Sequence, residues 1–190
     1  MVKAGIIGAS GYAGAELIRY LLAHPQVKIT YLASNMFEGR PISDAYPSFL
    51  GQDLPLCEKY DAESAAGSAD ILVQCQGNGT GMKVAPEIIA RGRKYIDVPA
   101  DFRLKDLELY KKYYAIDHSA VDLLKEAVYG VPELHPEEVK SARLTANPGC
   151  YATGAILALA PLVKNRLVDL KSIIVDSKSG VSGAGRSKID

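Results

Sequence analysis

The sequence contains no tryptophan, only three phenylalanines and three histidines in 190 residues, and no net charge, because 22 basic residues balance 22 acidic ones. A chain without net charge has no overall field that would attract it to nucleic acid or to an anionic membrane. No run reaches the ~18 apolar residues of a membrane-spanning helix, and the short apolar start lacks the features of a signal peptide. These absences predict a cytoplasmic protein that binds neither nucleic acid nor membrane.

Cysteine is also scarce. Cys57, Cys75 and Cys150 are an odd number and show no C-x-x-C spacing, so we expect reduced thiols and no disulfide framework. The three histidines lie far apart in the sequence, with no cysteine at ligand spacing. The sequence therefore predicts no metal site.

What remains is an ordinary globular composition, with 48% hydrophobic and 23% charged residues. Short apolar runs alternate with amphipathic helical patterns along the chain. We expect strands at 2–7, 27–33, 69–75, 94–98, 143–146 and 172–176, and helices at 12–24, 82–91, 136–141 and 150–163. This alternation predicts an α/β fold with a doubly wound parallel sheet of the Rossmann type.

The pattern also divides the chain into two parts. Residues 1–147 contain five strands with their crossovers and form a dinucleotide-binding domain of ordinary size. Residues 148–190 contain one helix, one strand and a glycine-rich tail, which are too little to bury a core. We expect them to be the incomplete start of an α+β catalytic or dimerisation domain.

A glycine-rich turn joins the first strand to the first helix. Glycines permit a tight turn and let backbone N–H groups approach a pyrophosphate at the positive end of the helix. The spacing G-x-x-G-x-x-G is a variant of the dinucleotide pattern, and a turn without a ligand is the alternative. The residues expected to hold the dinucleotide are Gly8, Ser10, Gly11, Tyr12, Ala13 and Gly14.

The end of the second strand indicates which dinucleotide binds. An NAD-binding domain usually has an acidic residue there for the ribose 2′-hydroxyl, whereas 31–36 contains none. Ser34, Asn35 and Arg40 offer donors that suit a 2′-phosphate, so we predict NADP. Glu38 argues against this choice, and a solvated polar loop is the alternative.

Cys150 follows Asn147-Pro148-Gly149 and opens the helix at 150–163. Pro148 keeps Asn147 out of helical geometry, and Gly149 permits a sharp turn. A thiolate at a helix N-terminus is stabilised by the dipole and by free N–H groups, which could also receive an oxyanion. We predict that Cys150 is a nucleophile; a buried structural cysteine is the alternative, and it is the role expected for Cys57 and Cys75.

Several segments together resemble the N-acetyl-gamma-glutamyl-phosphate reductases, which belong to the aspartate-semialdehyde dehydrogenase-like group. These segments are GASGYAGAELIRYLLAHP (8–25), ADFRLKD (100–106), AVYGVPEL (127–134), ARLTANPGCYATGAILALAPL (142–162) and SIIVDSKSGVSGAGR (172–186). They extend along the whole chain and are specific in combination.

The resemblance implies NADPH-dependent reduction of N-acetyl-gamma-glutamyl phosphate to the semialdehyde, in arginine biosynthesis, through a thioester on Cys150. It implies that Arg103 and Asn147 contact the substrate, where a guanidinium suits an acyl phosphate; for Arg103 a surface ion pair is the alternative. Independently of the resemblance, the exposed edge of the unfinished second part favours self-association, so we expect a homo-oligomer for the full-length protein. The further residues that the resemblance implies at the cofactor are Ser179, Gly180 and Gly183.

Two departures from the family stand out. The family usually has Pro-His-Gly after the third strand, where this chain has Gln76-Gly77-Asn78-Gly79. The family's general acid–base histidine is expected downstream of residue 186, and none of the histidines at 24, 118 and 135 occupies that motif position. We therefore expect the isolated 190-residue chain to lack turnover. The alternatives are an acyl-aminoadipyl-phosphate reductase, with a substrate one methylene longer, and a non-catalytic dinucleotide-binding or assembly module.

Overall fold

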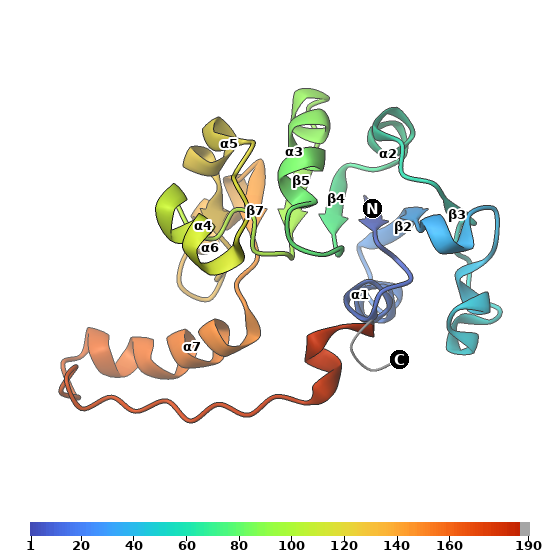
Figure 1. Ribbon diagram of the computed structural model, residues 1–190. Helices are drawn as coiled ribbons and strands as arrows, with labels where there is room; N and C mark the ends of the chain where they lie inside the picture. Colours follow the sequence, from blue (N-terminus) through green and yellow to red (C-terminus); the bar gives the residue numbers. More distant parts are fainter. Residues whose placement is uncertain (187–190) are drawn as a thin grey trace.

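The structure, a computed structural model, describes residues 1–186 and contains one parallel sheet with helices on both faces (Figure 1). In chain order its seven strands are β1 (Val2–Ile7), β2 (Val27–Ala33), β3 (Cys57–Glu58), β4 (Ile71–Gln74), β5 (Lys94–Asp97), β6 (Val128–Tyr129) and β7 (Leu144–Ala146). The order across the sheet is β3-β2-β1-β4-β5-β7-β6, and every adjacent pair is parallel. The predicted doubly wound α/β fold is confirmed.

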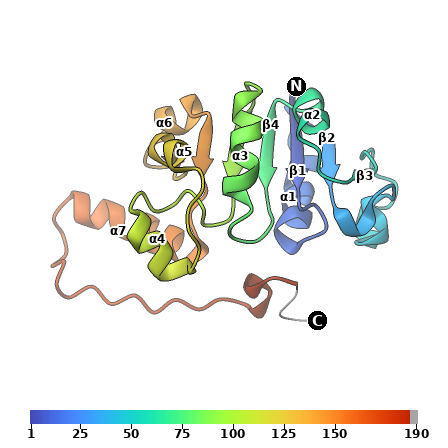
Figure 2. The ribbon, with the colours of Figure 1, turned by 45° about the horizontal axis from the view of Figure 1, so that its top comes forward.

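Helices cover both faces of this sheet, α1 on one face and α2 and α3 on the other (Figure 2). The α-helices are α1 (Tyr12–Leu22), α2 (Ala62–Ser68), α3 (Gly81–Ala90), α4 (Leu107–Tyr114), α5 (Val121–Glu126), α6 (Pro136–Ser141) and α7 (Cys150–Lys164). Four short 3-10 helices are η1 (Asn35–Phe37), η2 (Ile42–Asp44), η3 (Pro47–Phe49) and η4 (Val181–Ala184).

Two hydrophobic cores result, one on each face of the sheet. Ile6 of β1 packs with Ile18 of α1 on one face, and the next residue, Ile7, packs with Ile88 of α3 on the other. Successive side chains of a strand point to opposite faces, so a strand covered on both sides is apolar throughout. This explains why the buried parts of the strands are largely apolar in the sequence, as at the end of β1.

One predicted strand is wrong. Residues 172–176 run as extended chain without strand pairing, because a β-strand needs a neighbouring strand for its hydrogen bonds and the described chain brings none beside this segment. The short elements β3, β6, α2, α4 and α5 were not expected from the sequence.

The helix α7 lies apart from both cores. It is apolar around most of its circumference, yet none of its residues is buried within the part of the chain that the structure describes. The segment after it runs back along the helix and reaches the neighbourhood of α1 (Figures 1 and 2). Among residues 1–186, no helix combines the length and the apolar character needed to cross a membrane.

Asp97, the last residue of β5, is a fully buried carboxylate. Burial and, after it, the nearby carboxylate of Asp101 raise its pKa to about 7, against the lowering effects of the neighbouring backbone N–H groups and of Arg103. A carboxyl group with a raised pKa favours the folded state when it is protonated, and this stability is lost as the pH rises through the folded-state pKa.

We therefore expect Asp97→Asn to remove a pH-dependent loss of stability. The wild-type free energy of unfolding should fall between about pH 4 and pH 8, and the variant should lack a decrease on the order of a few kcal/mol over that range. Urea unfolding at several pH values measures the difference. Asp122→Asn, which changes an exposed carboxylate, is the control and should follow the wild type. Parallel curves for wild type and Asp97→Asn would contradict the expectation.

Candidate functional site

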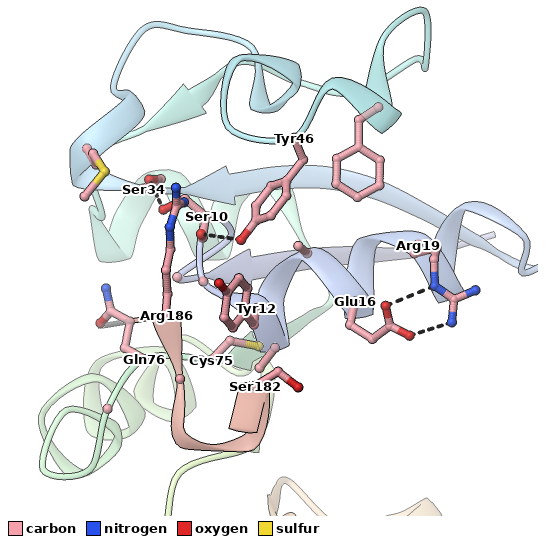
Figure 3. A pocket seen from close by; sticks show the side chains of 18 of the residues that line it. Ser10, Tyr12, Glu16, Arg19, Ser34, Tyr46, Cys75, Gln76, Ser182 and Arg186 are labelled. Atoms are coloured by element: carbon pink, nitrogen blue, oxygen red, sulfur yellow. Dashed lines mark hydrogen bonds and ion pairs between the residues drawn. The ribbon is translucent and has the colours of Figure 1, made fainter. Parts of the chain in front are cut away.

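The strand order reverses between β1 and β4, which lie side by side although their connections leave in opposite directions. In a doubly wound sheet this reversal opens a crevice at the carboxyl ends of the strands, where ligands bind. The structure has a cleft of about 1450 Å³ at this place (Figure 3). It is lined by the segments that follow β1, β2 and β4 and by residues 182–186.

The glycine turn forms the floor of the cleft. Gly8 has a φ of +87°, and Gly11 donates its N–H to the carbonyl oxygen of Gly8 (3.1 Å) before α1 begins. A Cβ on Gly14 would overlap that same carbonyl oxygen and lie 2.8 Å from the Cα of Ala9. The turn and the first helical turn are thus in backbone contact, and the N-terminus of α1 opens into the cleft. This cradle fits a pyrophosphate group.

Six turn residues were named from the sequence. The structure brings five of them to the cleft wall, namely Gly8, Ser10, Gly11, Tyr12 and Ala13. The sixth, Gly14, does not line the cleft; because it has no side chain, α1 can lie in contact with the turn.

The end of β2 supplies the next part of the wall. Ser34 is buried, and its hydroxyl shares a hydrogen bond with the Ser10 hydroxyl (2.7 Å), which ties β2 to the turn. Asn35 is exposed on the cleft. Arg40 is directed elsewhere: its Nη2 lies 2.7 Å from the Asp44 carboxylate, and its guanidinium stacks over Phe37. Of the three proposed donors, the structure brings Ser34 and Asn35 to the cleft.

Two aromatic residues of the cleft were missed. Tyr46 and Phe49 line it and pack edge to face, with ring centroids 6.1 Å apart. The Tyr46 hydroxyl donates to the carbonyl oxygen of Ser10 (2.9 Å), which fixes the segment of 3-10 helices over the glycine turn (Figure 3). The only signal in the sequence was a pair of aromatic residues in a stretch otherwise rich in glycine and proline.

The two thiols outside the nucleophile motif have the properties of structural cysteines. Burial raises the pKa of Cys57 to about 11 and that of Cys75 to about 12, with Asp44 and Asp97 adding to the respective shifts. Such thiols are poor nucleophiles near neutral pH.

Cys150 is different because it is exposed and is the first residue of α7. It lies at a small cavity of about 220 Å³, which it shares with Tyr151, Gly154 and residues 177–179. The N-cap residue Gly149 is extended and has no side chain to cap the helix. The first backbone N–H groups of α7 therefore remain available near the Cys150 thiol.

Arg103 lies directly beside the segment that carries Cys150. Its Nε donates to the carbonyl oxygen of Asn147 (2.8 Å), and its Nη2 donates to that of Val98 (2.6 Å). Its Nη1 is next to Gly149, 3.1 Å from where a Cβ would stand. The alternative of a surface ion pair is not what the structure shows, since the guanidinium is half-buried against backbone carbonyls.

The glycine-rich tail contacts both cavities. Ser179 lines the cavity at Cys150, and Gly183 lines the large cleft, as do Ser182 and Arg186. Gly180 is the extended residue that precedes η4. The tail thus passes from the thiol to the cleft at the glycine turn.

Residues 3–142 match the family "Semialdehyde dehydrogenase, NAD binding domain", which is most of the chain. The chain belongs to the semialdehyde dehydrogenase family. Residues 150–190 also match "Semialdehyde dehydrogenase, dimerisation domain".

Curated members of this semialdehyde dehydrogenase family resemble the chain closely. It is 50% identical over 185 residues to the N-acetyl-gamma-glutamyl-phosphate reductase of Pelotomaculum thermopropionicum, covering 97% of this chain and 53% of that protein. The identity to the same-named protein of Acetivibrio thermocellus is 47% over 186 residues, or 98% of this chain and 54% of that protein. The chain thus spans about half the length of these relatives.

Solved semialdehyde dehydrogenases share the fold. Aspartate semialdehyde dehydrogenase II from Vibrio cholerae aligns with a TM-score of 0.66 at 20% identity, covering 100% of this chain and 50% of that one. The aspartate semialdehyde dehydrogenase from Candida albicans, solved with NADP, gives 0.63 at 18% identity, covering 87% and 47%.

The contact at Gly14 predicts the effect of one added methyl group. Gly14→Ala should separate α1 from the turn, destabilise the protein by about 1–3 kcal/mol and weaken dinucleotide binding by about tenfold or more. Urea unfolding and titration of NADPH fluorescence measure the two effects. Gly67→Ala in α2 is the matched control, since nothing lies within 4 Å of its added Cβ. An unchanged Gly14→Ala variant would show that the close approach is not needed.

Proposed function

We propose that the protein containing this chain is an NADPH-dependent N-acetyl-gamma-glutamyl-phosphate reductase, which forms the semialdehyde in arginine biosynthesis. The observation that carries the proposal is the exposed Cys150 at the start of a helix, connected by one continuous tail to a dinucleotide cleft. Reduction of an acyl phosphate through a thioester needs these two parts together. The relatives named above support the substrate.

In the first step the Cys150 thiolate attacks the acyl carbon, forming a C–S bond. The carbonyl oxygen takes up the electron pair, and the free N–H groups at the start of α7 are placed to stabilise that oxyanion. The electron pair returns, the bond from carbon to the phosphate oxygen breaks, and phosphate leaves. Arg103 holds the Asn147–Cys150 segment through the Asn147 carbonyl, and its Nη1 beside Gly149 is available to the departing phosphate.

The cleft would hold the dinucleotide, and its reduced nicotinamide would supply the hydride needed to convert the thioester into an aldehyde with release of the Cys150 thiolate. The chain's own contribution is to hold that dinucleotide in the cleft: the glycine turn at the pyrophosphate, Ser34 and Asn35 at the ribose, and Gly183 with its neighbours across the opening. We place the boundary between the cofactor domain, 1–147, and the catalytic part, 148–190, immediately before the segment that carries the thiol.

We further propose that the protein is cytoplasmic and forms a homo-oligomer. The match of residues 150–190 to a dimerisation domain supports the second point. The balanced charge supports a small molecule as its partner and argues against nucleic acid or a membrane.

Loss of the nucleophile should abolish the reaction. In the intact protein, Cys150→Ala should lower phosphate-dependent oxidation of the semialdehyde with NADP by at least about 10⁴-fold. Cys57→Ala, which removes a buried thiol on β3, is the control and should retain activity. Undiminished activity in Cys150→Ala would refute the proposed mechanism.

The choice of NADP has its own test at the end of β2. Asn35→Asp is nearly isosteric and places a negative charge where we expect the 2′-phosphate, so the ratio of kcat/KM for NADPH to that for NADH should fall by about tenfold or more. Gln26→Glu, an equal change of charge in the exposed turn before β2, should leave the ratio unaltered. A ratio that Asn35→Asp does not alter would place the 2′-phosphate elsewhere.

A further inference from the structure

The segment Gln76–Gly79, which departs from the family's Pro-His-Gly, makes a specific contact that the proposed reaction does not use. Asn78 lies on the cleft wall, and its side-chain oxygen Oδ1 accepts the backbone N–H of Ala100 at 3.1 Å. Ala100 is buried in the segment that follows β5. Asn78 therefore ties the cofactor side of the cleft to the neighbouring connection.

Asp101 makes the reciprocal tie. Its Oδ1 accepts the backbone N–H of Gly79 (2.7 Å) and the hydroxyl of Tyr110 (2.7 Å), and its Oδ2 accepts the N–H of Met82 (3.1 Å). The side chain is fully buried, so these bonds are shielded from water. Each of the two segments thus uses a side chain to hold the backbone of the other.

The second segment continues to the nucleophile. Two residues after Asp101, Arg103 bonds the carbonyl oxygens of Val98 and Asn147, and the N–H of Asn147 donates to the Asp97 carbonyl (2.8 Å). The N–H of Arg103 also donates to the carbonyl oxygen of Ala100 (3.2 Å). Hydrogen bonds therefore run from Asn78 on the cleft wall through Ala100 and Arg103 to Asn147, three residues before Cys150.

We propose that Asn78 is a positioning residue, which sets the cofactor-side segment 76–79 relative to Cys150 through Ala100, Asp101 and Arg103. The inference rests on the proposed function, because the proposed reaction requires a fixed distance between the dinucleotide and the Cys150 thiol. The amide oxygen carries this role. If Asn78 only contacted the bound dinucleotide, its effect would come from its amide nitrogen or from the volume of its side chain.

Two substitutions separate these roles in the intact protein. Asn78→Asp keeps an oxygen acceptor for the Ala100 N–H, whereas Asn78→Leu has a similar volume and no acceptor. Asn78→Ala removes the same acceptor without adding apolar surface and replaces Asn78→Leu if that variant does not fold. Asn165→Leu, an exposed position at the end of α7, is the matched control. Thermal unfolding checks that every variant is folded.

The readout is the rate at which iodoacetamide alkylates Cys150, with and without saturating NADPH, and it requires no turnover. In wild type and in Asn165→Leu we expect NADPH to slow alkylation by about fivefold or more. In Asn78→Leu this protection should fall below about twofold, because a misplacement of segment 76–79 by about 1 Å is enough to disrupt a reacting geometry. In Asn78→Asp the protection should be retained at saturating NADPH, because the acceptor for the Ala100 N–H is kept. Hydrogen exchange at the Ala100 amide should be faster in Asn78→Leu and near wild type in Asn78→Asp.

Full protection in Asn78→Leu would overturn the proposal, as would equal loss in Asn78→Asp or absence of protection in wild type. The proposed function fails separately. Protection that follows this pattern without semialdehyde oxidation would refute the activity and support the positioning role. Oxidation without any protection would support the activity and refute the positioning role.

Discussion

The parallel direction of the strands is the constraint on which the rest of the molecule depends. Parallel strands bring all their carboxyl ends to one edge of the sheet, and the reversal of strand order between β1 and β4 separates the connections at that edge. The glycine turn, the end of β2 and the segment after β4 meet there because of this topology. Helix α7 with Cys150 leaves from the same edge, after β7. Neither the dinucleotide cleft nor the site at Cys150 therefore needs a special arrangement of loops to bring its residues together.

Much of this architecture could be predicted from the sequence because burial on both faces makes the strands largely apolar. The bounds of β1, β2 and α6 agree with the prediction, and the glycine turn and the start of α7 were identified correctly. The two-residue strands β3 and β6 could not be predicted, because so short a strand is defined by its neighbour in the sheet. The same physics made 172–176 misleading: its composition favours a strand, but a strand also requires a partner.

The arginines show a different limit of sequence reasoning. Arg40 and Arg103 were both expected to meet phosphate groups. The structure gives Arg40 a carboxylate partner four residues away, whereas Arg103 uses Nε and Nη2 for two backbone carbonyls and keeps Nη1 beside Gly149. A guanidinium has five N–H donors in a fixed plane, so the partner it takes depends on which acceptors the fold brings into that plane. The residue type alone does not contain this information.

The pairing between strands has a consequence for the accuracy of the site. Gln74 of β4 is level with Asp97 of β5, and Asp97 is level with Ala146 of β7, so the three connections that carry Asn78, Asp101 and Cys150 leave the sheet at one height. A slip of one residue in any of these strands would move its connection by about 3.3 Å and turn its side chains to the opposite face. The register of the hydrogen-bonded strands thus determines the distance between the Cys150 thiol and the cofactor cleft.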